Sequence, residues 1–191
     1  MRKQMLPLLA GLLLASAAQA QILKKPTELK EPPSPTKTYP ELLVEELPRF
    51  TGGDPAIKDP NVALQEFLAK NVIIPEFAKR NLLAAAVDVG FVITADGRMD
   101  SLTVTNGACC GFDEEALRVA RLTEGKWQPG KIQGQPVRVR YDMPVVFRVQ
   151  NKNASSPKKI QEMAALYSNY RNSAEYTRDR EAYEQKVREQ K

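Results

Sequence analysis

The chain has 191 residues, of which 42% are hydrophobic, and carries 28 Lys and Arg against 23 Asp and Glu. This length holds one domain of ordinary size, and a net charge of +5 without a lysine-rich run among aromatics gives no indication of a nucleic-acid partner. The chain has no histidine, which removes the usual acid–base catalyst near neutral pH and the commonest zinc ligand.

Residues 1–20 have the features of a secretory signal: a basic start at Arg2 and Lys3, an apolar run, and small residues at Ala18 and Ala20. The apolar run of about 14 residues is shorter than the ~20 residues that span a bilayer. We predict cleavage of this signal peptide after Ala20 and export to the periplasm. The alternative is an uncleaved anchor in the inner membrane.

Residues 21–40 are rich in proline and lysine, which predicts a semi-rigid linker in the polyproline II conformation with nothing to bury. A globular domain is expected over residues 41–150. Near its start, Asn61 is expected to cap a helix that runs to residue 70. Pro75 suits the first turn of a second short helix over residues 76–81.

Residues 85–94 alternate between apolar and other side chains, which predicts a strand. An Asp-Gly turn at 96–97 and a return strand over 99–105 complete a hairpin. The next loop holds the only two cysteines, Cys109 and Cys110. Because a bridge between neighbours closes a strained ring, we interpret them as two half-buried thiols or as an intermolecular bridge, with a redox switch as the alternative. Two sulfurs alone do not form a metal site.

A third helix is predicted to begin at Asp113, whose side chain can accept from the free backbone amides of the first turn. Glu114 and Glu115 follow, where the positive end of the helix dipole favours acidic side chains. Phe112 and Leu117 have the spacing of a hydrophobic staple. The acidic cluster could also be interpreted as catalytic carboxylates, but helix electrostatics explain it without a substrate, and no nucleophile–base pair forms without histidine.

A long strand follows over residues 136–149, with a strict two-residue alternation. One face is apolar and is expected to pack on the core: Val137, Val139, Tyr141, Met143, Val145, Phe147 and Val149. The other face carries Arg138, Arg140, Asp142 and Arg148. Three arginines on the open face of a strand are typical of a sheet edge.

The last part of the chain, residues 151–191, predicts a charged helical extension. Ser155 or Ser156 can cap a helix in which Pro157 occupies the first turn. Its apolar residues have the spacing of an amphipathic helix or a short coiled coil: Ile160, Met163, Tyr167, Tyr170 and Ala174. This helix either binds a partner, stays in solvent or folds back on the domain.

The order of elements predicts the fold class. It is an α+β domain with a small three-stranded antiparallel sheet packed against two or three short helices, followed by the C-terminal helix. The chain thus divides into a signal peptide (1–20), a proline-rich linker (21–40), the domain (41–150) and the helical extension (151–191).

Several short motifs occur in one order along the domain. They are Pro48-Arg49-Phe50 with Gly52-Gly53, Pro75-Glu76-Phe77-Ala78, Val87 to Ile93 followed by Asp96-Gly97-Arg98, Asp113 to Val119, Trp127 with Pro129-Gly130, Gly134 with Pro136-Val137, and Pro144 with Phe147. Together they resemble the C-terminal domain of TonB-like energy transducers, most closely the forms common in Bacteroidetes-type bacteria. Ile74 and Ala85 depart from the usual tyrosine and glycine, at positions that affect packing and twist.

The resemblance implies a protein-binding domain, because in this family the last strand recruits an extended segment of an outer-membrane transporter by β-augmentation. The partner is then an outer-membrane TonB-dependent transporter or another envelope protein, and a homodimer stays open. The docking edge is expected at Val137, Arg138, Val139, Arg140, Tyr141, Asp142, Val146 and Arg148.

Two alternatives stay open beside this hypothesis. One is a structural or adaptor protein that assembles through the C-terminal helix. The other is a membrane-anchored energy transducer, if the signal is not cleaved. In each case we expect no enzyme activity, no small-molecule substrate, no metal and no cofactor.

Overall fold

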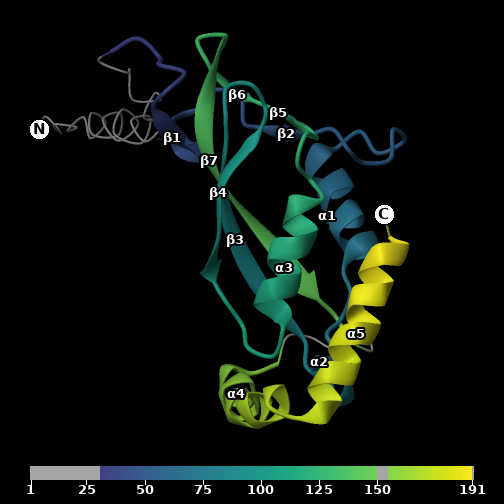
Figure 1. The fold of residues 1–191 in the computed structure, drawn as a ribbon. Helices are drawn as coiled ribbons and strands as arrows, with labels where there is room; N and C mark the ends of the chain where they lie inside the picture. Colours follow the sequence, from purple (N-terminus) through teal and green to yellow (C-terminus); the bar gives the residue numbers. More distant parts are fainter. Residues whose placement is uncertain (1–30, 150–154, 191) are drawn as a thin grey trace, which may run out of the picture. The chain divides into compact units, whose positions relative to one another are not determined.

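A computed structural model describes residues 31–149 and 155–190 (Figure 1). The predicted signal peptide, its cleavage position and the first part of the predicted linker lie outside these residues. The helices are α1 (Pro60–Asn71), α2 (Glu76–Arg80), α3 (Phe112–Arg121), α4 (Pro157–Arg171), α5 (Ala174–Glu189) and the 3-10 helix η1 (Glu41–Leu43). The strands are β1 (Thr38–Pro40), β2 (Arg49–Phe50), β3 (Ala85–Ile93), β4 (Met99–Asn106), β5 (Trp127–Gln128), β6 (Gly130–Ile132) and β7 (Gln135–Phe147).

The main sheet has the strand order β1-β7-β3-β4, and β6 pairs with the beginning of β7. β3 forms the predicted hairpin with β4 and pairs antiparallel with β7 along its whole length. This confirms the predicted α+β fold with three antiparallel strands. The structure adds β1, which runs parallel to β7, and a separate short pair of β2 with β5.

The core lies between this sheet and the helices α1 and α3, which contact β7 and β3 (Figure 1). The predicted apolar face of β7 is confirmed, with at most 1% of each side chain exposed at Val137, Val139, Met143, Val145 and Phe147. Burying one such side chain contributes about 1.5–3 kcal/mol. A slip of one residue would turn this whole face to solvent, so the apolar pattern fixes the register of β7 against β3.

The starts of two helices differ from the predicted ones. Asp59, rather than Asn61, caps α1 and accepts from the Asn61 backbone N–H at 2.8 Å. Gly111, with a φ of 89°, precedes α3. Asp113 lies inside the first turn and accepts from the Ala108 N–H at 2.7 Å. The predicted Asp113 cap is therefore wrong, because the left-handed turn at the glycine begins the helix earlier.

The C-terminal extension consists of two helices rather than one. Ser156 caps α4, as predicted, and accepts from the Lys159 N–H at 3.3 Å. Ser173 caps α5 in the same way and accepts from the Tyr176 N–H at 3.3 Å. Ala174 therefore begins a new helix and lies exposed, instead of continuing the apolar seam of α4. The prediction of one continuous helix is wrong because a second serine cap interrupts it.

Candidate partner-binding edge

β7 is the strand for which the sequence predicts partner binding, and its backbone can pair along two sides. One side pairs with β3 from Val139 to Phe147. Before that stretch, β6 pairs with Gln135–Val137. On the other side, β1 pairs in parallel with Arg138–Arg140. The prediction of a sheet edge along the whole strand is therefore wrong for residues 138–140, because β1 covers that part.

The open part of this side runs from Asp142 to Phe147. The Asp142 N–H donates to the Glu41 carboxylate at 3.3 Å, so it points away from β3. Because backbone groups alternate in direction along a strand, residues 144 and 146 face the same way. Residue 144 is a proline without an N–H, so within β7 only Val146 adds a donor there. No strand among the described residues pairs with the outer side of this part of β7.

Three apolar members of the predicted site, Val137, Val139 and Tyr141, pack toward the core. Val137 and Val139 are fully buried. The ring of Tyr141 lies 5.5 Å from that of Phe91 and 5.1 Å from that of Trp127. Burial raises the pKa of the Tyr141 hydroxyl above its ordinary value, which keeps it neutral. These three side chains hold β7 in place; the two valines are closed to a partner, and Tyr141 is half-buried.

Three charged members of the predicted site, Arg138, Arg140 and Asp142, lie on the open face of the sheet and are paired there. Arg138 donates to Asp100 of β4 at 2.6 Å and to the Thr38 hydroxyl of β1 at 3.4 Å. The hydrogen bond from Arg138 holds the pKa of Asp100 below its ordinary value. Arg140 lies 3.7 Å from Asp142. Both arginines thus already have a carboxylate nearby, in exposed pairs that contribute only about 0–1 kcal/mol each.

Val146 and Arg148 are the predicted residues that the structure brings to the open end of β7. Val146 is 38% exposed. Arg148 follows the end of the strand and lines a shallow hollow together with Ile73, Ile74 and Lys79. The exposed surface of the open part and its end therefore combines Asp142, Pro144, Val146 and Arg148. Residues 137–140 of the predicted site lie away from this surface, in the part of β7 that pairs with β6 and β1.

Residues 71–149 match the family model described as the Gram-negative bacterial TonB protein C-terminal. The chain carries a TonB C-terminal domain. No curated protein and no solved structure matched the chain. The match runs from the end of α1 to just beyond β7 and includes the hairpin and α3, whereas β1 and the helices α4 and α5 lie outside it.

TonB C-terminal domains are envelope-associated and interact with outer-membrane transporters. They are energy-transducing or binding domains rather than enzymes. The match confirms the family predicted from the motifs and indicates a TonB-like envelope protein. Within the part of the chain that the structure describes, none of the helices has the length and the apolar surface needed to cross a bilayer.

The strand β1 precedes the matched region of the TonB C-terminal domain, and sequence reasoning missed it. Tyr39, at its centre, is 3% exposed, and its hydroxyl accepts from the Ser34 N–H at 3.0 Å. Just downstream, the backbones of Glu46 and Lys131 pair with N–O distances of 3.1 and 2.8 Å. The linker prediction is wrong for residues 38–40, because the tyrosine ring is buried against the sheet. That ring, the one aromatic side chain of the predicted linker, was the available signal.

The helices α4 and α5 pack back on the TonB C-terminal domain at α2. The ring of Phe77 lies 5.2 Å from that of Tyr167 and 5.0 Å from that of Tyr170. Arg80 forms an ion pair with Asp179 of α5. Of the alternatives left open by the sequence, the structure shows the extension folded back on the domain. The apolar seam of α4 is thus used within the chain.

Glu115 is a buried carboxylate that joins three parts of the chain. It is 1% exposed and accepts two hydrogen bonds from Arg118, each of 2.7 Å. It also accepts from the Ile73 N–H and from the Tyr183 hydroxyl of α5, each at 2.6 Å. Burial and this last bond raise the pKa of Tyr183. Glu115 therefore links α3 to Ile73 and to α5, in addition to its place at the helix start. Its burial is tolerated because a buried charge that is fully hydrogen-bonded and paired costs little.

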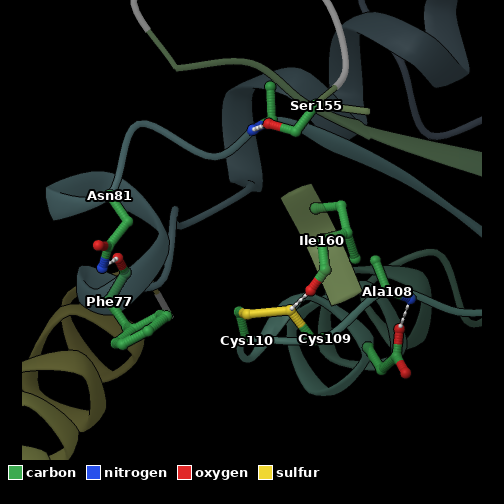
Figure 2. The surroundings of a disulfide bond; sticks show 9 residues. Phe77, Asn81, Ala108, Cys109, Cys110, Ser155 and Ile160 are labelled. Atoms are coloured by element: carbon green, nitrogen blue, oxygen red, sulfur yellow. Dashed lines mark hydrogen bonds between the residues drawn. A yellow bond between two sulfur atoms is a disulfide. The ribbon is translucent and has the colours of Figure 1, made fainter. Parts of the chain in front are cut away.

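Cys109 and Cys110 form a disulfide between adjacent residues (Figure 2). The interpretation as free thiols or as an intermolecular bridge is therefore wrong. Cys110 has a φ of 74°, so a left-handed turn at this residue accompanies the bond. The sulfur of Cys109 lies 3.4 Å from the carbonyl oxygen of Ile160 in α4 (Figure 2). A disulfide sulfur carries no hydrogen, so this is a packing contact between the disulfide loop and α4.

Proposed function

We propose that this chain is a periplasmic binding module that takes part in TonB-dependent transport. In this proposal it docks an extended segment of an outer-membrane transporter, or of another envelope protein, along the outer side of β7. The observation that carries the proposal is that, among the residues the structure describes, no strand pairs with the outer side of Asp142–Phe147 in a sheet of the TonB C-terminal type. Added strands gain affinity from backbone hydrogen bonds and selectivity from alternate side chains.

The open edge offers a short but defined set of contacts. The carbonyl groups of Asp142, Pro144 and Val146 face it, together with the N–H of Val146, by the alternation of the strand. The exposed side chain of Val146 provides an apolar contact. Arg148 at the end of the strand would favour a partner segment with an acidic residue there.

The substitution Val146→Pro tests this proposal at a single backbone group. The Val146 N–H points away from β3, so a proline there removes an edge donor without removing a bond of the β3–β7 ladder. Val146→Thr is the matched control, because it keeps the N–H and the β-branched shape. The probes are synthetic peptides that span the periplasm-exposed N-terminal segments of the TonB-dependent transporters encoded in the same genome.

Binding to the mature chain is measured by fluorescence polarisation. The loss of one net backbone hydrogen bond, about 0.5–1.5 kcal/mol, weakens binding about 2- to 13-fold. The proline ring adds a steric obstacle to pairing, so we expect at least a tenfold loss for Val146→Pro and less than about a threefold change for Val146→Thr. Equal affinities of the two variants, both with wild-type melting temperatures, would show that this edge is not used.

Export by a cleavable signal peptide is part of the proposal, and its support comes from the sequence features of residues 1–20. The expected mature protein begins at Gln21. Intact-mass spectrometry of the protein from a periplasmic fraction measures this end directly. A mass that includes Met1, in protein recovered with the inner membrane, would instead favour the membrane-anchored transducer.

The adaptor alternative, in which the C-terminal helices make the main contact with a partner, has less support. The aromatic residues Tyr167 and Tyr170 of α4 contact Phe77 of the domain. A partner that used this seam would first have to separate α4 from the domain. The open edge of β7 needs no such rearrangement for its first contacts.

A further inference from the structure

We propose that β1 is an intramolecular occupant of the docking edge, which covers part of β7 until a partner segment displaces it. The inference rests on the proposed function of β7 as the docking strand. β1 pairs with Arg138–Arg140 on the side of β7 that continues directly into the open part at Asp142 (Figure 1). The chain therefore holds a segment of its own in the row of positions that an added strand would use.

The supply of backbone donors shows why this occupant matters. On the outer side of β7 the outward-facing residues are 138, 140, 142, 144 and 146. β1 covers Arg138 and Arg140, and the carboxylate of Glu41 accepts the N–H of Asp142. Residue 144 is a proline. A partner that leaves β1 in place thus finds a single free N–H within β7, that of Val146. A partner that replaces residues 38–41 also gains the outward backbone groups of Arg138, Arg140 and Asp142.

β1 is held by few contacts. It has three residues, and only Tyr39 is buried, at 3% exposure, while Thr38 and Pro40 are exposed. The side-chain bonds at its two ends are long: 3.4 Å from Arg138 to Thr38 and 3.3 Å from the Asp142 N–H to Glu41. Local opening is easiest where buried apolar contacts are few, so β1 is suited to detach without unfolding the sheet.

The chain just after β1 is anchored separately. Glu46 pairs with Lys131 of β6 through two backbone hydrogen bonds, of 3.1 and 2.8 Å, and through a side-chain ion pair of 2.9 Å. These contacts would keep a detached β1 close to its edge, at a high effective concentration. The observed affinity of a partner is then lowered by the fraction of molecules in which β1 is docked.

The test compares the wild-type mature chain with Tyr39→Ala, which removes the one buried ring of β1, and with Tyr39→Phe as the matched control. Phenylalanine keeps the ring and loses only the hydroxyl that accepts from Ser34. The first measurement is amide hydrogen exchange by NMR. For Tyr39→Ala we expect at least tenfold faster exchange at Arg140, with no change at Met143, whose N–H faces β3.

The second measurement uses a strand probe that needs no transporter: a synthetic peptide with the sequence of residues 33–43 of this chain. We expect it to bind Tyr39→Ala at least tenfold more tightly than wild type or Tyr39→Phe. Glu41→Ala is a second variant, at a half-buried position of η1, for use if Tyr39→Ala does not fold. For Glu41→Ala we expect faster exchange at Asp142 and tighter binding of the peptide.

The outcomes separate this inference from the proposed function. If Arg140 exchange and peptide affinity are the same in wild type, Tyr39→Ala and Glu41→Ala, then β1 does not close the edge. If transporter peptides bind wild type and Tyr39→Ala equally well, docking stands and its control by β1 is refuted. If the residue 33–43 peptide behaves as expected but no transporter peptide binds any variant, β1 closes the edge and the proposed partner is wrong.

Discussion

Glu115→Ala is the substitution for which the structure gives a large and specific expected loss of stability. The carboxylate receives four hydrogen bonds, two from Arg118 and one each from the Ile73 N–H and the Tyr183 hydroxyl. Alanine removes all of them and leaves the Arg118 guanidinium, only 16% exposed, without its carboxylate. The Arg118 bond to the Asn71 carbonyl, of 2.5 Å, remains but does not neutralise the charge.

The magnitude follows from the burial of this pair. Removing one partner of a fully buried ion pair costs about 3–5 kcal/mol. Because Arg118 retains some exposure, the lower end of this range applies, about 3 kcal/mol. For a chain of this length each kcal/mol lowers the melting temperature by about 2–4 °C, so the expected decrease is about 6–12 °C. Tyr183→Phe removes a single bond to the carboxylate and is expected to cost about 1.5 kcal/mol.

The assay is thermal and urea unfolding of the mature chain, followed by circular dichroism near pH 7. Glu114→Ala is the matched control, because it removes the same side chain one position away, where the residue is exposed. We expect the control to stay within about 0.5 kcal/mol of wild type. If the free energies of unfolding of Glu115→Ala and Glu114→Ala agree within that error, Glu115 does not have the structural role assigned to it.

Two further predictions concern the contacts of the C-terminal helices and the disulfide. Burial raises the pKa of Tyr167 to about 12, above the ordinary value of about 10. The folded state therefore binds this proton more tightly, so the stabilisation is complete below pH ~10 and is lost as the pH rises from about 10 to 12. Melting temperatures should fall over this range and fall less in Tyr167→Phe; identical slopes would contradict the assignment. The intact mass under non-reducing conditions should be lower than that of the reduced chain by two hydrogens, and a reducible dimer would contradict the Cys109–Cys110 bond.

The apolar, core-facing side of β7 could be predicted from the sequence, whereas the strand that pairs with its outer edge could not. Alternation from Val137 to Phe147 is a local signal, because successive side chains of a strand point to opposite faces and the apolar ones face the core. Pairing on the outer side depends on residues 38–40, about a hundred positions earlier, in a segment whose proline content indicates a linker. A three-residue strand with one buried ring has too short a pattern to be found by periodicity.

The same contrast explains the helix starts and the disulfide. Ser156 followed by Pro157 is a local cap signal and was interpreted correctly. At α3, two capping signals competed, and Gly111 with its left-handed backbone began the helix before Asp113 could cap it. Whether Cys109 and Cys110 bond to each other depends on the backbone turn between them, which residue type alone does not specify.

Two segments outside the family match, β1 and the helix pair α4–α5, are held on the TonB C-terminal domain by contacts of different strength. β1 relies on three paired residues and the ring of Tyr39. The helices α4 and α5 rely on the ring contacts of Phe77, an ion pair at Arg80 and the bond of Tyr183 to the buried Glu115. Because local opening follows the weakest set of buried contacts, we expect β1 to separate from the sheet while α4 and α5 remain docked. In the proposed docking mode, a partner would then reach the edge of β7 without disturbing the rest of the domain, and the segment that moves would lie before the binding module rather than after it.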